Sequence, residues 1–200
     1  MRTLTIVALL AAGAASLMAQ APQGAPPGGG RGRGPQTPPL IMTTTAFEDG
    51  GVIPDKYTQA AGAMAPSPAL AWSQVPMGTQ SFVIIMHDPE PVLNKGSKMD
   101  ITHWVIWNIP GTSTGLAEGV AAGELPDGSR QVSLRSNSYM GPGAPPGPYH
   151  HYTFELYALD IKLDVPQGTP QDAANTRTAI VTAMDGHVLG KAVLVARFHR

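Results

Sequence analysis

The chain of 200 residues contains no cysteine. That absence excludes disulfide bridges, a thiol nucleophile and a lipid anchor attached through cysteine. An excess of basic residues is also missing, since 13 Lys and Arg stand against 14 Asp and Glu and give a formal net charge of −1. Proteins that bind nucleic acid draw much of their affinity from a broad basic face. We therefore expect no nucleic-acid partner.

Long hydrophobic runs are scarce as well. The mostly apolar run at residues 4–15 is shorter than the about 20 residues that a membrane-spanning helix needs. It follows Met1-Arg2 and precedes small residues around Ala19, a pattern typical of a secretory signal peptide. We predict a signal peptide at residues 1–19, export to the periplasm or the medium after its cleavage, and no stable membrane anchor.

Residues 20–39 contain few side chains that could form a core. They include six glycines and six prolines, and their only charges are Arg31 and Arg33. Such a segment cannot bury enough apolar surface to offset the entropy lost on ordering the chain, so we predict a flexible linker. A single folded domain is expected from residue 40 to residue 200.

The pattern of the predicted domain is one of short β-branched and aromatic runs separated by turn signals. This pattern predicts a mainly β fold, an antiparallel β-sandwich rather than alternating strands and helices. The stretch at 101–109 is apolar on both faces and should lie inside its sheet. The predicted strands are 41–47, 81–86, 102–109, 132–134, 149–159 and 191–198.

One helix is predicted near the C-terminus. Thr169 is placed to cap it, Pro170 suits its first turn, and Gly186 ends it. Residues at helical spacing form its inward stripe; they are Ala173, Thr176, Ile180 and Met184.

Ionisable side chains lie at the ends of two of the predicted strands. Alternate residues of a strand share a face, so Asp88 lies in line with the apolar residues of 81–86, and His150 and Tyr152 lie on the apolar face of 149–159. An unpaired carboxylate at the edge of a buried face would cost several kcal/mol. We therefore expect His103 and His150 to be the partners of Asp88.

These segments carry a resemblance. Asp88-Pro89-Glu90, then His103-Trp104, then the GPGAPPG segment at 141–147, and finally His150-His151-Tyr152 resemble the two signature regions of the phosphatidylethanolamine-binding protein family. The flanking segments resemble its bacterial, Raf-kinase-inhibitor-like branch; they are 67–72, 75–82 and 185–198.

The resemblance implies a large β-sandwich with a C-terminal helix packed against it and a small anion-binding pocket at one end. The residues expected to bind the ligand are Asp88, Glu90, His103, Gly141, Pro142, His150 and Tyr152. Two positions depart from the family pattern: Glu90 stands where many relatives have a second aspartate, and His151 stands where relatives usually carry arginine. The strand alternation turns His151 away from the pocket, so it is not expected to be a ligand.

The expected chemistry is capture of an anion. The O–H of tyrosine and the N–H groups of histidine suit phosphate oxygens at about 2.7 to 3.0 Å. The glycines of 141–147 either let backbone N–H groups converge on an anion or belong to a plain connecting loop. The expected function is non-catalytic binding of a small anion or phosphorylated head group, without a cofactor. Binding should tighten as the pH falls through about 6.5, the range in which histidine titrates.

Two other functions stay open. Asp88, Glu90, His103 and His150 are also residue types that bind a divalent metal or act as an acid and base in a hydrolase, although the sequence contains no H-E-x-x-H or G-x-S-x-G motif. Some relatives inhibit kinases or serine proteases, so a protein partner such as a protease is a further expectation. The sequence fits either a monomer or a homodimer.

Overall fold

The computed structural model describes residues 38–62, 65–91, 95 and 100–200. The predicted signal peptide and most of the predicted linker lie outside these residues. Within them, no helix is long and apolar enough to cross a membrane.

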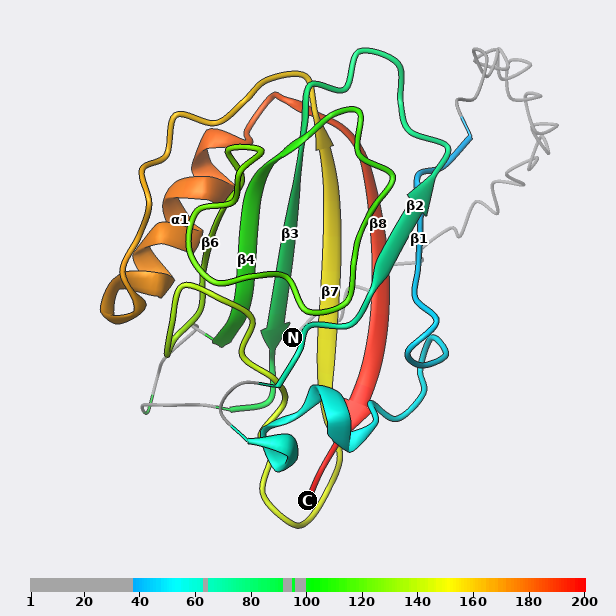
Figure 1. The fold of residues 1–200 in the computed structure, drawn as a ribbon, viewed down its shortest axis with the longest axis vertical. Helices are drawn as coiled ribbons and strands as arrows, with labels where there is room; N and C mark the ends of the chain where they lie inside the picture. The colour runs from blue at the N-terminus through cyan, green and yellow to red at the C-terminus, as the bar shows by residue number, and fades with distance from the viewer. Residues whose placement is uncertain (1–37, 63–64, 92–94, 96–99) are drawn as a thin grey trace, which may run out of the picture. The chain divides into compact units, whose positions relative to one another are not determined.

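The main element is a five-stranded antiparallel sheet in the order β6-β4-β3-β7-β8 (Figure 1). Its strands, in the order of the sheet, are β6 (Arg130–Val132), β4 (Ile101–Pro110), β3 (Ser81–Asp88), β7 (His150–Leu159) and β8 (Val188–Phe198).

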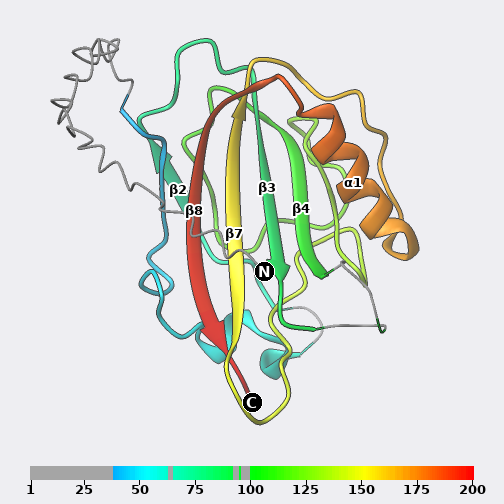
Figure 2. The same cartoon turned by 180° about the vertical axis from the view of Figure 1, so that it is seen from behind.

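A smaller antiparallel sheet in the order β1-β2-β5 lies over one face of the large sheet, as the two opposite views show (Figures 1 and 2). Its strands are β1 (Ile41–Thr43), β2 (Leu70–Ser73) and β5 (Gly115–Leu116). The helix α1 (Ala173–Ala183) packs on the other face of the large sheet, preceded by the 3-10 turn η3 (Pro170–Asp172). Two further 3-10 turns, η1 (Asp55–Tyr57) and η2 (Gln59–Ala61), lie between β1 and β2 in the chain.

Alternation along the central strands gives the molecule a core on each face of the large sheet. In β3, Phe82, Ile84 and Met86 join the core between the two sheets. Val83 and Ile85 join the core beneath α1. Both faces of β3 and β4 are covered, and these strands are buried at most positions. The prediction that 101–109 lies inside its sheet is confirmed.

The helix confirms its predicted stripe, since the four predicted residues are all buried. Gly186 follows the helix end with φ of 79°, in the left-handed region that glycine adopts without strain. The predicted cap at Thr169 is wrong, because its side chain makes no capping hydrogen bond. The chain enters the helix through the 3-10 turn at Pro170 instead, and the Thr176 hydroxyl donates to Asp172 O at 3.1 Å.

The strand predictions failed where strands are short. β2 and β5 have four and two residues, too few for alternation to distinguish them from loops. β1 ends at Thr43 rather than at residue 47, because the Thr44 side chain accepts the N–H of Ala46 at 3.1 Å and turns the chain. β6 begins two residues earlier than predicted and ends at Val132.

Candidate functional site

Antiparallel pairing of β3 with β7 brings the end of one strand beside the start of the other. Met86 pairs with Phe154 and His87 with Thr153, so Asp88 and His150 meet at this end of the sheet. His150 Nδ1 lies 2.8 Å from Asp88 Oδ2. The predicted partnership of these two residues is confirmed.

Asp88 is a buried carboxylate, with only 2% of its surface exposed. Burial raises its pKa above the ordinary value for aspartate, while the hydrogen bond from His150 and that from the Glu90 N–H to Oδ1 at 3.1 Å oppose the rise. Both carboxylate oxygens therefore have donors, yet the net effect of the surroundings still disfavours the charge.

His103, on β4, is not bound to Asp88, and that part of the prediction is wrong. Its Nδ1 donates to Met140 O at 2.9 Å. Burial lowers the pKa of His103 to about 4, with the Met140 carbonyl opposing the shift and the nearby Arg135 charge adding to it. The ring is therefore neutral at pH 7, and because Nδ1 carries the proton, Nε2 is a hydrogen-bond acceptor.

Tyr152, two residues after His150 on β7, is fully buried. Its ring packs edge-to-face on His103 with centroids 5.1 Å apart, and its hydroxyl oxygen accepts the Ala144 N–H at 3.2 Å. Burial and the negative charge of Asp88 raise the pKa of Tyr152. The phenol stays protonated at physiological pH and keeps one O–H to donate.

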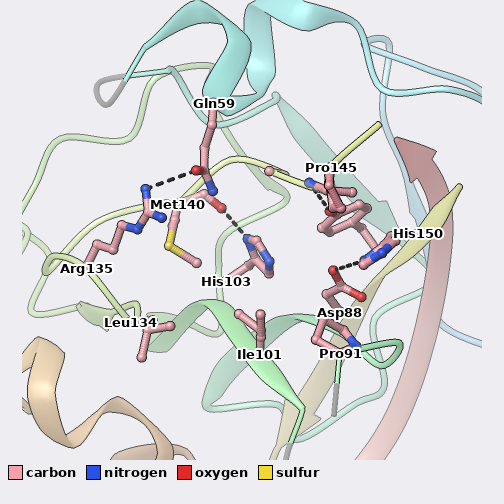
Figure 3. Close-up of a pocket in the computed structure, with 13 residues that line it drawn as sticks. Gln59, Asp88, Pro91, Ile101, His103, Leu134, Arg135, Met140, Pro145 and His150 are labelled. Carbon is pink, nitrogen blue, oxygen red and sulfur yellow. Dashed lines mark hydrogen bonds and ion pairs between the residues drawn. The ribbon is translucent and has the colours of Figure 1, made fainter. Parts of the chain in front are cut away.

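These side chains line one cavity of about 370 Å³ (Figure 3). Four of the seven predicted ligand residues lie in its wall: Asp88, His103, His150 and Tyr152. The remaining lining residues come from several loops and strand ends; they are Gln59, Pro91, Ile101, Leu134, Arg135, Met140, Gly143, Ala144 and Pro145.

The other three predicted residues, Glu90, Gly141 and Pro142, lie outside this lining. The carboxylate of Glu90 is turned to His151, with Oε1 2.6 Å from Nδ1 and Oε2 accepting the His151 N–H at 3.0 Å. Although burial raises the pKa of Glu90, these contacts bring it below the ordinary value for glutamate. His151 is absent from the cavity lining, as the alternation predicts, and supplies Glu90 with a partner.

Gly141 and Pro142 support the cavity wall through hydrogen bonds to Gln59, which lines it. Their carbonyl oxygens accept hydrogen bonds from the side chain and the backbone N–H of Gln59, at 2.9 and 2.8 Å. A Cβ at Gly141 would lie 2.6 Å from Tyr57 O, so glycine is required here for close backbone packing. The Ala144 N–H is taken by Tyr152, so that amide does not contribute to the predicted anion-binding nest.

Sequence reasoning missed Gln59 and Arg135. Arg135 Nη1 donates to Gln59 Oε1 at 3.0 Å across 76 residues of chain, and no local pattern predicts such a contact. One signal was available, because Arg135 is the only charged residue between Arg130 and His150.

Comparisons with known proteins agree with this architecture. The family model described as "Phosphatidylethanolamine-binding protein" matches residues 43–199. The chain belongs to this family. It is 43% identical over 164 residues to a UPF0098 protein of Methanothermobacter thermautotrophicus, an alignment that covers 80% of this chain and 99% of the relative.

Solved members of the family share the fold. A structure from Chlamydia trachomatis, described as a phosphatidylethanolamine-binding protein homologue, superposes with a TM-score of 0.67 at 29% identity and covers 81% of this chain and 98% of its own. YbcL of Escherichia coli gives a TM-score of 0.66 at 22% identity, covering 80% and 98%. The predicted family and fold class are confirmed.

The same end of the sheet has the ligand types of a metal site. Asp88, Glu90 and His150 each offer one atom, and these atoms lie within 4.8 Å of one another. Two carboxylates and an imidazole suit a divalent cation such as zinc. Such an ion would compete with the contacts that His150 and His151 now make to the two carboxylates.

Proposed function

We propose that this member of the phosphatidylethanolamine-binding protein family captures a small phosphorylated ligand of head-group size in the cavity, without turnover. The observation that carries the proposal is the convergence of Asp88, His103, His150 and Tyr152 on one cavity. Its volume of about 370 Å³ falls at the small end of the range of about 300–1,000 Å³ typical of ligand sites.

The cavity offers both kinds of hydrogen-bonding group. Donors come from the Tyr152 phenol and the Arg135 guanidinium, and acceptors from the Asp88 carboxylate and His103 Nε2. A phosphate ester with an amine or hydroxyl substituent needs both kinds, because its oxygens accept and its substituent donates. Family membership supports ligand binding in general.

Capture without turnover is supported by what lines the cavity. Its lining in the described part of the chain includes no Ser, Thr, Lys or Cys side chain that could act as a nucleophile. The imidazole that lies deepest, His103, is neutral and has its Nδ1 proton committed to a backbone carbonyl. The first feature disfavours covalent catalysis by a hydroxyl of Ser or Thr, an amine or a thiol, and the second disfavours acid–base catalysis by His103.

Titration calorimetry with phosphoethanolamine and with inorganic phosphate tests the proposal. We expect saturable binding by the wild type and a loss of at least tenfold in affinity for His150→Ala. His187→Ala is the matched control, since His187 also sets its Nδ1 2.8 Å from an aspartate, Asp160. It precedes β8 at the opposite end of the ten-residue strand β7, about 30 Å away.

Equal affinity for the His150→Ala and His187→Ala proteins would place the ligand elsewhere. No binding of either probe to the wild type would overturn the proposal.

A metal-dependent hydrolase is the second candidate, favoured by the single observation that Asp88, Glu90 and His150 present clustered ligand atoms. Metal analysis of protein purified without chelators separates the two functions. Zinc bound stoichiometrically to the wild type and lost from Glu90→Gln would favour the hydrolase. Protein free of metal that still binds phosphoethanolamine supports capture.

A further inference from the structure

The last residues of the chain present basic side chains on the face of the large sheet that is turned away from the cavity. In β8, Ala196 and Phe198 are buried in the core between the two sheets. Alternation therefore puts Arg197, and His199 after it, on the opposite face. The helix α1 packs over β3 and β4 and leaves this end of β8 uncovered, beside the start of β7 (Figure 2).

One aromatic ring holds the two basic side chains together. Tyr149, directly before β7, has Arg197 Cζ 5.1 Å from its ring centroid, and the centroid of the His199 ring lies 4.1 Å from the same ring. His150 pairs with Phe198, so Tyr149 and His199 continue the register of β7 and β8 past the ends of the strands. The ring of Tyr149 is partly exposed, and the cluster is therefore at the surface.

Both basic residues have an unused nitrogen. Arg197 Nε and His199 Nδ1 are buried and have no hydrogen-bond partner among the described residues. The Nε of arginine always carries a proton, and a buried donor without an acceptor indicates a missing water or ion. Two other buried nitrogens in the described ranges lack a partner, His87 Nε2 and Arg130 Nε, but each of those residues forms an ion pair with a carboxylate.

The chain provides no acidic side chain to balance this cluster. All 14 acidic residues lie in the part of the chain that the structure describes, and none of them forms an ion pair with Arg197, His199 or Arg200. The cross-strand neighbour of Arg197 is His151, and His151 already has Glu90 as its partner. Positive charge at this end of β8 therefore has room for an external anion.

We propose that Arg197 and His199, held against Tyr149, form a binding site for a phosphate group on the face of the sheet opposite the cavity. A guanidinium offers paired N–H donors that match phosphate oxygens, and a histidine N–H adds another. Arg200, which is exposed, adds a further positive charge. None of these residues lines the cavity, so the site is separate from the one that carries the proposed function. The phosphate group belongs either to a soluble ester or to a lipid head group.

The first test observes the site directly. The imidazole signals of the wild type are followed by ¹H–¹³C NMR during titration with inorganic phosphate at constant ionic strength, and the signal of His199 is identified by its absence from His199→Gln. We expect this signal to shift saturably with phosphate and not with chloride. A His199 signal that does not respond to phosphate, whatever the His150 signal does, would overturn the proposal.

The second test removes the guanidinium. Arg197→Gln should weaken the phosphate affinity measured at His199 at least tenfold, and Arg197→Lys, which keeps the charge but loses the paired donors, should lie between Arg197→Gln and the wild type. The Arg197 backbone bonds to Gly51 and Ile53, at 2.8 and 2.9 Å, are available to all these variants.

Lys162→Gln is the matched control for charge, because Lys162 is exposed and follows the far end of β7. We expect its affinity within twofold of the wild type. Equal affinities for the Arg197→Gln and Lys162→Gln proteins would show that Arg197 does not hold the ion, and the proposal would fail.

The position of Tyr149 gives a third test. Tyr149→Phe keeps the ring and should bind phosphate within twofold of the wild type, whereas Tyr149→Ala frees both basic side chains and should bind at least threefold more weakly. Equal binding by these two variants would contradict the role of the ring.

Sedimentation with vesicles distinguishes the two sources of phosphate. The probes are phosphatidylcholine vesicles with and without phosphatidylglycerol. Sedimentation that needs phosphatidylglycerol and is lost in Arg197→Gln would assign a lipid head group. A saturable response of His199 to inorganic phosphate without sedimentation would assign a soluble phosphate. No response to inorganic phosphate together with sedimentation that Arg197→Gln retains would overturn the site.

Discussion

His103 owes its protonation state to burial next to a backbone carbonyl, and this makes it a source of pH-dependent stability. Its pKa is about 4 in the folded protein, against about 6.5 for an unperturbed histidine. The unfolded chain takes up the proton first as the pH falls, so the stability that neutral His103 provides is complete above about pH 6.5 and is lost toward pH 4.

We predict that lowering the pH from 7.5 to 4 reduces the free energy of unfolding of the wild type by about 3 kcal/mol more than that of His103→Asn. The magnitude follows from the pKa shift of His103, at about 1.4 kcal/mol per pKa unit. Asp88 acts in the opposite sense, because its pKa is raised, but its contribution is shared by both proteins and cancels in the difference. Urea titrations of the two proteins across this range measure the effect. Parallel pH profiles would show that His103 is not held neutral.

For single residues, the sequence predicted well which side chains gather at the site. It predicted their protonation states and hydrogen-bond partners less well. Alternation along β7 places His150 and Tyr152 correctly on the buried face. That His103 would bind Met140 O rather than Asp88 depends on a contact across 37 residues, and nothing in a strand pattern encodes it.

Among the elements, the long strands and the helix could be read from periodicity because each buries a continuous face. α1 is the clearest case, since its stripe packs into a core on the face of the sheet away from β1 and β2. Short strands such as β5, and the 3-10 turn η2 that carries Gln59, have too few residues for a period to show.

The separation of the two cores predicts that helix packing and ligand binding are independent. Ile180 of α1 is fully buried, so Ile180→Ala should lower the free energy of unfolding by about 2–5 kcal/mol through the lost contacts and the cavity left behind. Val181→Ala, at an exposed neighbouring position, should change it by less than about 0.5 kcal/mol.

Chemical denaturation measures both stabilities, and calorimetry under native conditions should find the affinity of Ile180→Ala for phosphoethanolamine within twofold of the wild type. A tenfold loss of affinity in folded Ile180→Ala protein would contradict this independence.

For the molecule as a whole, the order of the motifs along the chain predicted the family, the fold class and the meeting of β3, β4 and β7 at one end of the sheet. The opposite wall of the cavity could not be predicted, because Gln59 and Arg135 come from segments that only the tertiary structure joins. The chemistry of the site depends on both walls, which together supply its donors, its acceptors and its charges.

The central claim, capture of a phosphorylated ligand without turnover, is tested most directly by the ³¹P NMR spectrum of phosphoethanolamine mixed with the full-length protein. We predict that the resonance broadens or shifts with increasing protein, and that its integral stays constant over days. A spectrum unaffected by the protein, or a growing signal of inorganic phosphate that requires Asp88 and His150, would contradict the claim.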